Sequence, residues 1–204
     1  MSPGLTTPSF VGWRAIVLHR PHPNVDALMA QCARMGITGE QAWPDFPRDR
    51  APDAFNVLLI DADMGHDGQL PWKEGQAPLP IIALIGAEAP GRIAWSIAQG
   101  ADAQLLKPIG SAGLYSAITM ACHSFAHRRA LAGEIAALKL KLGHRQQLAE
   151  ATALLMLKKN CGAEEAYQHL RVFAMAQRST IEEAATAIVE EFEIHGFRNV
   201  DGGR

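Results

Sequence analysis

Four short runs of consecutive apolar residues in the first half of the chain predict buried strands. They lie at 13–19 (WRAIVLH), 56–61 (NVLLID), 79–86 (LPIIALIG) and 103–108 (AQLLKP). Residues 25–36 and 89–100 instead place apolar positions three or four apart and end in glycine, which is typical of helices. Strands that are apolar on both faces and alternate with helices favour a doubly wound α/β fold with a parallel sheet.

The second half of the chain has a different pattern. All 12 prolines and all 4 tryptophans precede residue 109, and proline breaks helix interiors, so its absence permits long helices. Nothing interrupts a helix between Ser111 and about residue 153. Along it, an apolar stripe at 4-3-4 spacing consists of Leu131, Ile135, Leu138 and Leu142. This stripe predicts a short coiled-coil seam and a parallel homodimer, with a helix packed on its own first domain as the alternative.

The last part of the chain divides into three short helices. The first ends near Lys159, before the sequence NCG, and the second covers 163–178. Ser179 or Thr180 can cap the third, because a side-chain oxygen there accepts from free N–H groups and two glutamates follow in the first turn. Helices of this size form a minimal bundle, so we expect an α/β unit, a long helix and an all-α unit.

Composition narrows the classes of function. The formal net charge of −2 does not indicate nucleic acid or an anionic membrane as a partner. No run of eighteen apolar residues predicts a membrane span, and the N-terminal MSPGLTTPSF lacks the features of a secretory signal. Cys32, Cys122 and Cys161 fit neither a disulfide framework nor a zinc spacing. We therefore expect free thiols, a cytoplasmic location, no metal, no cofactor and no enzymatic activity.

Candidate chemistry gathers at the ends of two predicted strands. Asp61 stops the run at 57–60, and Lys107 stops the run before Pro108. Because ligands of parallel α/β sheets bind at the carboxyl ends of the strands, we expect these side chains to meet.

The order Asp61-Ala62-Asp63-Met64-Gly65, followed by GADAQLLKP at 100–108, resembles a response-regulator receiver domain across residues 11–124. The resemblance implies that Asp61 is a phosphoacceptor and that Lys107 is its partner. Two features depart from the pattern. The acids that would hold Mg²⁺ after the first strand are replaced by HRPH at 19–22, and the hydroxyl residue ending the fourth strand is replaced by Ile85. We interpret Asp61 as a vestigial phosphoacceptor, with residual phosphorylation as the alternative.

The motifs AxxLLM, AYQHLR and AMAQRSTIEEAA, in this order within about residues 145–193, resemble the ANTAR domain. That family is an RNA-binding transcription antiterminator module. The implied division is a receiver-like domain at 11–124, a coiled-coil linker helix at 125–147, an ANTAR domain at 148–193 and a tail at 194–204. The same order occurs in amidase-operon and nitrate-assimilation antiterminators.

This resemblance implies binding to leader-mRNA hairpins, with control by a ligand-sensing partner protein on the receiver-like domain. Basic and amide side chains suit phosphates and unpaired bases. The candidates are Lys158, Lys159, Asn160, Gln168, Arg171, Gln177 and Arg178. Five basic against three acidic residues over 144–178 is a modest excess, so the resemblance carries this prediction rather than the charge. A phosphorylation-dependent regulator using Asp61, a DNA-binding regulator and a scaffold protein are the rival hypotheses.

Overall fold

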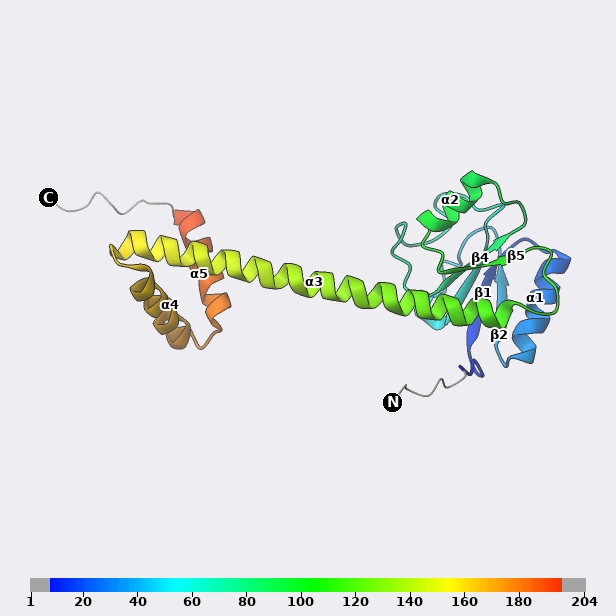
Figure 1. Cartoon of the computed structure of the whole chain (residues 1–204), viewed down its shortest axis with the longest axis horizontal. Helices are drawn as coiled ribbons and strands as arrows, with labels where there is room; N and C mark the ends of the chain where they lie inside the picture. The colour runs from blue at the N-terminus through cyan, green and yellow to red at the C-terminus, as the bar shows by residue number, and fades with distance from the viewer. Residues whose placement is uncertain (1–7, 196–204) are drawn as a thin grey trace, which may run out of the picture. The chain divides into compact units, whose positions relative to one another are not determined.

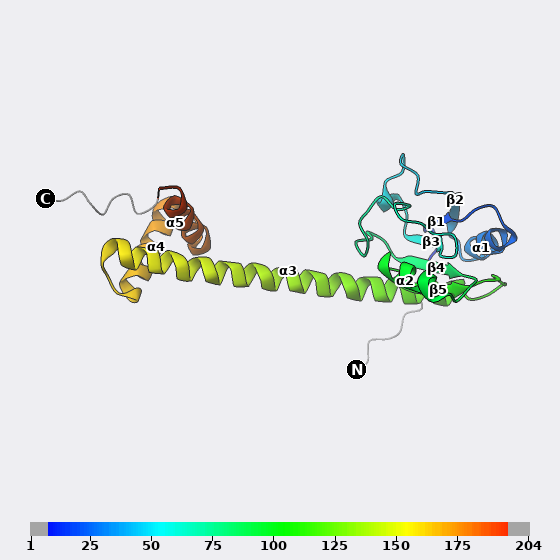
Figure 2. The same ribbon diagram turned by 90° about the horizontal axis from the view of Figure 1, so that it is seen from above.

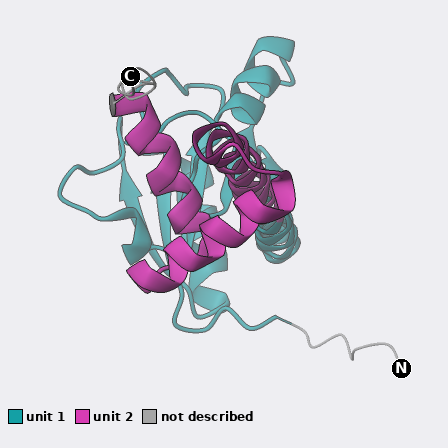
Figure 3. Cartoon of the chain, turned by 90° about the vertical axis from the view of Figure 1, so that its left-hand side faces the viewer, with its two compact units in different colours: residues 1–130 teal, residues 131–204 magenta. Residues whose placement is uncertain are grey.

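The computed structural model describes residues 8–195 of the chain. It divides into two compact units, unit 1 with residues 1–130 and unit 2 with residues 131–204 (Figure 3). Helix α3 (Leu114–Lys159) begins in unit 1 and ends in unit 2. The predicted tail at 194–204 lies, from residue 196 onward, outside the described residues.

Unit 1 is built on a parallel sheet of five strands in the order β2-β1-β3-β4-β5 (Figure 2). The strands are β1 (Arg14–Leu18), β2 (Thr38–Ala42), β3 (Val57–Asp61), β4 (Ile81–Ile85) and β5 (Ala103–Leu106). Every residue of β3 and β4 is buried, which explains their uninterrupted apolar sequence. The prediction of a doubly wound parallel sheet is confirmed.

The sequence pattern predicts four strands, and the structure adds a fifth, β2. Its sequence TGEQA has no apolar run, because it is an edge strand that pairs only with β1, from Arg14↔Thr38 to Leu18↔Ala42. Intermediate or exposed side chains along β2 leave no hydrophobic signal for periodicity to detect.

The two faces of the sheet are covered differently. Helix α1 (Pro23–Arg34) and the first turns of α3 pack on one face, where Leu28, Cys32 and Ile118 are fully buried. The other face is covered by α2 (Pro90–Ala98) and by aromatic side chains from the loops before and after β3. In these loops, outside the 3₁₀ turn at Pro52–Ala54, the described chain forms no helix. The proline-rich composition of this region accounts for that.

Unit 2 is a three-helix bundle. Helices α4 (Ala163–Gln177) and α5 (Ile181–His195) lie beside the last turns of α3 in both views (Figures 1 and 2). The core is formed by small and aliphatic side chains: Ala151, Leu155, Ala166, Leu170, Ala174, Ala184, Ala185, Ile188 and Val189. Helix α3 passes through the expected linker without a break, and Gly133 and Gly143 do not interrupt it. Within residues 8–195, no helix has the length and apolar character needed to cross a membrane.

The cap of α5 is Thr180. Its Oγ1 accepts from the N–H of Glu183 at 3.2 Å, and the Glu183 carboxylate accepts from the N–H of Thr180 at 2.8 Å. This reciprocal pair is a capping box, which satisfies two N–H groups that the helix leaves free. Of the two predicted caps, the threonine makes these contacts.

Candidate functional site

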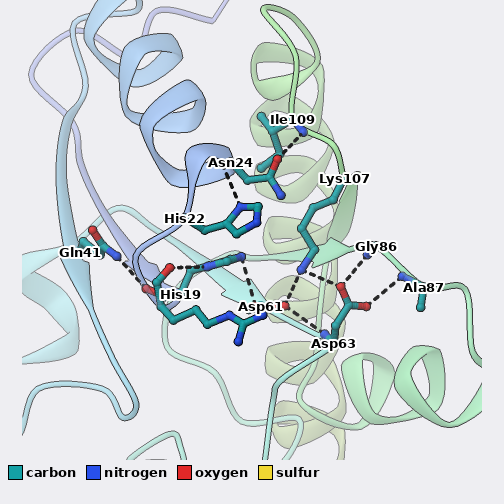
Figure 4. A network of polar contacts seen from close by, with 11 residues as sticks. His19, His22, Asn24, Gln41, Asp61, Asp63, Gly86, Ala87, Lys107 and Ile109 are labelled. Carbon is teal, nitrogen blue, oxygen red and sulfur yellow. Dashed lines mark hydrogen bonds and ion pairs between the residues drawn. The ribbon is translucent and has the colours of Figure 1, made fainter.

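The predicted pair of Asp61 and Lys107 meets at the carboxyl edge of the sheet (Figure 4). Asp61 is the last residue of β3, and Lys107 follows β5 directly. The Lys107 Nζ lies 2.7 Å from Asp61 Oδ1, and the two side chains are only 11% and 1% exposed. An ion pair this short and this buried is a charge-assisted hydrogen bond that holds the ends of two strands together.

His19 is the member of this site whose role the sequence did not reveal. It follows β1 directly, its side chain is 2% exposed, and its Nε2 lies 3.1 Å from Asp61 Oδ2. The backbone of His19 is fixed on both sides, because its N–H donates to Ala42 and its carbonyl accepts from Gln41 Nε2. The one available signal was its position immediately after a buried strand, the same position that Asp61 occupies.

One contact of His19 fixes the hydrogen on Nδ1. Nδ1 is 2.6 Å from the carbonyl oxygen of Arg20, and a carbonyl only accepts, so Nδ1 carries a hydrogen. A neutral ring would then present a lone pair of Nε2 to the Asp61 carboxylate. The two atoms are at ion-pair distance without hydrogen-bond alignment.

Asp63 completes the network. Its carboxylate accepts from the N–H of Gly86 at 2.8 Å and of Ala87 at 3.1 Å, and it lies 2.6 Å from Lys107 Nζ. Burial alone would raise the pKa of Asp63, but the hydrogen bonds from Lys107, Ala87 and Gly86 outweigh it and hold the pKa below its usual value. Two carboxylates therefore face one lysine at this edge of the sheet.

The Mg²⁺ ion of receiver domains does not fit this arrangement. Both oxygens of Asp61 are already in contact, one with Lys107 Nζ and the other with His19 Nε2, and the Lys107 ammonium would repel a divalent cation. Among residues 8–195, no group of three or more His, Cys, Asp or Glu side chains is arranged to hold a metal ion. Ile85, which stands in the hydroxyl position, packs among Ala62, Ala83 and Trp95.

Arg128 fastens the start of α3 to the other end of the sheet. Its Nη2 lies 2.9 Å from Asp102 Oδ1, and its Nη1 donates to the carbonyl of Gly75 at 3.1 Å. Asp102 also accepts from the N–H of Ile81 at 3.1 Å. Burial raises the pKa of Asp102, against the opposing effect of these hydrogen bonds. Arg128 therefore links α3, within unit 1, to the loop that contains Gly75 and to the loop that contains Asp102.

The seven predicted RNA-binding side chains are all exposed in unit 2. They lie at the end of α3 (Lys158, Lys159), in the turn that follows (Asn160), on α4 (Gln168, Arg171) and at its end (Gln177, Arg178). Lys158 also has a structural contact, because its Nζ is 3.8 Å from Glu191 and 5.4 Å from the ring centre of Phe192.

Two of these residues have unusual backbone geometry. Asn160 and Arg178 have φ angles of 53° and 54°, and they are the only non-glycine residues of the described chain with positive φ. Asparagine adopts this left-handed conformation readily, whereas arginine does so at a cost that glycine would avoid. An outlier of this kind at a turn is a reason to look for a function of the Arg178 side chain.

The four seam residues, Leu131, Ile135, Leu138 and Leu142, are between 46% and 63% exposed. A helix turns about 100° per residue, so these four lie on one face of α3. The buried bundle residues Ala151 and Leu155 lie roughly 180° and 220° round the helix from Leu142. The seam and the bundle therefore occupy opposite faces of the same helix.

Comparison with known proteins matches both parts of the chain. The family described as AmiR, N-terminal, matches residues 13–122, and the family described as ANTAR domain matches residues 136–189. The chain belongs to the AmiR family of ANTAR-domain antiterminators. Its first unit is thus an AmiR-type receiver-like domain, and its second unit carries the ANTAR domain.

Two relatives of this AmiR-family chain are regulatory proteins. The aliphatic amidase regulator of Pseudomonas aeruginosa is 25% identical over 182 residues, which cover 82% of this chain and 86% of the relative. The transcriptional regulatory protein PdtaR of Mycobacterium tuberculosis is 30% identical over 111 residues, 54% of each chain, so the match spans about half of that relative. Among solved structures, the response regulator StyR matches with a TM-score of 0.46 and 15% identity over 87% of this chain and 98% of its own.

Proposed function

We propose that this AmiR-family protein binds hairpins in leader mRNA through its ANTAR bundle and thereby prevents transcription termination. The observation that carries the proposal is the ANTAR match to residues 136–189, which includes every predicted RNA-binding residue. All seven side chains are exposed, and they stand at the two turns of the bundle and along α4. Basic groups there suit phosphates, and the amides of Asn160 and Gln168 suit unpaired loop bases.

Dimerisation through the seam is part of this proposal. Four exposed apolar side chains at heptad spacing favour a parallel pair of α3 helices. The opposite orientation of the seam and the bundle leaves each bundle accessible in such a pair. Two linked bundles on two hairpins of one transcript would bind far more tightly than one bundle, because the second contact becomes intramolecular.

Control is proposed to come from a ligand-sensing partner protein on the receiver-like unit rather than from phosphorylation. The support is the enclosure of Asp61, whose side chain is 1% exposed and has Lys107 Nζ against one oxygen and His19 Nε2 against the other. The second candidate is a regulator phosphorylated at Asp61, which the presence of Lys107 favours. Acetyl phosphate with Mg²⁺, followed by mass spectrometry of the intact protein, separates them. A phosphorylated Asp61 that raises RNA affinity would establish the second candidate.

The RNA proposal is tested by binding assays at several salt concentrations. The full-length protein is compared on the leader RNA of its own operon, a scrambled RNA and duplex DNA, without a phosphodonor. We expect preference for the leader RNA and a salt slope that reports the phosphate contacts. Equal binding to all three nucleic acids, or none, would contradict the proposal.

Variants locate the RNA-binding surface. Replacing Lys159 and Arg178 by Ala is expected to weaken binding several-fold and to reduce the salt slope by about one per lost phosphate contact. The matched control replaces Lys139 and Lys141, two exposed lysines of α3 that precede the bundle. The same loss in the control would indicate a nonspecific charge effect.

Arg178→Gly distinguishes a functional side chain from a structural one. Glycine adopts φ = 54° without strain, so the bundle should melt at the same temperature or higher. RNA affinity should nevertheless fall, because the guanidinium is gone. A variant that binds RNA as well as the parent chain would remove Arg178 from the interface.

A further inference from the structure

The carboxylate of Asp63 sits in a set of donors that has the chemistry of an anion site. Two consecutive backbone N–H groups, of Gly86 and Ala87, point at its two oxygens, and the Lys107 ammonium lies 2.6 Å from one of them (Figure 4). Adjacent N–H groups combined with an ammonium bind phosphate, sulfate and carboxylate ions. We call Gly86 N, Ala87 N and Lys107 Nζ the anion cradle.

The cradle is built for close approach of its occupant. Gly86 lacks a Cβ, and a Cβ placed there would come 2.7 Å from Asp63 Oδ2 and 3.2 Å from Lys107 Cε. The Lys107 side chain is held from the other side by Asp61 at 2.7 Å. The lysine of the cradle is thus held by a second contact besides Asp63, and the two N–H groups directly follow β4.

The occupant comes from a different element than its donors. Asp63 lies in the loop after β3, whereas the cradle belongs to the loop after β4 and the end of β5. The Asp63 side chain is 22% exposed, so a small ion from solvent could reach the cradle if that side chain were removed. The carboxylate ties two loops together where a bound oxyanion would do the same.

We propose that Asp63 is the resident ligand of a small-oxyanion site. The cradle can still bind an oxyanion, but the protein's own Asp63 carboxylate occupies it. Withdrawal of Asp63 opens the cradle to a free carboxylate or phosphate ion. This inference goes beyond the proposed RNA binding and does not depend on it. It explains why the site retains its lysine although Mg²⁺ does not fit and Asp61 is enclosed.

The test is chemical rescue of an Asp63→Ala variant of the full-length chain. All four tryptophans lie in unit 1, at residues 13, 43, 72 and 95, so tryptophan fluorescence reports the melting of this unit alone. Melting is measured in sodium formate, sodium phosphate and sodium chloride at equal ionic strength. Asp67→Ala, which removes an exposed acid from the same loop, is the matched control.

We expect Asp63→Ala to melt below the parent chain in chloride and to be stabilised by formate and by phosphate. At a free anion concentration about ten times its Kd, the rise is roughly 5 °C. The parent chain and Asp67→Ala should each melt at the same temperature in all three salts. Adding Lys107→Met to Asp63→Ala should abolish the stabilisation by formate and phosphate.

If Asp63→Ala does not fold, Asp63→Ser is used, because it retains a short polar side chain in the loop and still vacates the cradle. In that variant, ¹⁵N-labelled protein should show shifts of the Gly86 and Ala87 amide signals on titration with formate or phosphate. The absence of any anion response in the folded variants would overturn the proposal. So would an equal response of the parent chain, because its cradle would then be unoccupied.

Discussion

Replacing Lys107 by Met should reveal how strongly the buried network depends on its lysine. The substitution keeps the aliphatic stem and removes the charge that pairs with Asp61 at 2.7 Å and Asp63 at 2.6 Å. Removing one partner of a buried ion pair leaves an uncompensated charge, which typically costs about 3–5 kcal/mol. Unit 1 should therefore lose a large part of its free energy of unfolding.

The loss of free energy of unfolding has an upper limit, because the variant can protonate one carboxylate instead of keeping its charge uncompensated. For a carboxyl with an ordinary pKa of about 3.9, protonation costs about 4 kcal/mol at pH 7 and about 1.5 kcal/mol at pH 5. The variant takes whichever state costs less. The difference between variant and parent chain should thus shrink from about 3–4 kcal/mol at pH 7 to about 1.5 kcal/mol at pH 5.

The assay is urea unfolding followed by tryptophan fluorescence at both pH values, with Lys73→Met as the control for loss of an exposed lysine. The double variant Lys107→Met/Asp61→Asn should recover much of the loss, because the second change removes the uncompensated charge. A loss below about 1 kcal/mol at pH 7, or an equal loss at both pH values, would refute the reasoning that Lys107 compensates the carboxylates it contacts.

Two further outcomes are expected from the seam and from the thiols. Replacing Leu138 and Leu142 by Glu should convert the dimer into a monomer, as measured by light scattering. Leu140, a similarly exposed leucine on the opposite face of α3, is the control, and its replacement by Glu should leave the dimer intact. A dimer that persists in the double variant would place the interface elsewhere. Burial raises the pKa of the Cys32 thiol to about 11, so only about 0.1% is thiolate at pH 8, and Cys32 should react with a thiol reagent only when unit 1 unfolds. Labelling of Cys32 faster than unfolding measured by fluorescence would contradict this.

The parts of the fold that could be predicted are those with a strong apolar signal. The strands β1, β3 and β4 are almost entirely buried, and their runs of aliphatic residues mark them in the sequence. The edge strand β5 has only partly buried side chains, but its two leucines continue the same signal. The hydrophobic pattern did not predict the edge strand β2, because its polar side chains are accessible and it is held by backbone pairing with β1.

The candidate site could be predicted only in part, for a different reason. Asp61 and Lys107 end two strands of one parallel sheet, so topology alone brings them together. The contact of His19 with Asp61 depends on a ring orientation set by the Arg20 carbonyl. The cradle around Asp63 consists partly of backbone N–H groups, which every residue but proline has and no pattern of side chains can reveal.

The seam and the bundle lie on opposite faces of α3 in unit 2. The number of residues between them therefore sets the direction in which the bundle projects from the helix. Nine positions separate Leu142 from Ala151, and each inserted residue would rotate everything after it by about 100°. Two inserted residues would bring the bundle face round to the side of the seam, into the path of a second helix. Seven would restore the original direction to within about 20°. Length changes in this stretch are therefore compatible with an open bundle on a paired helix when they come close to whole helical turns, for example four, seven or eleven residues.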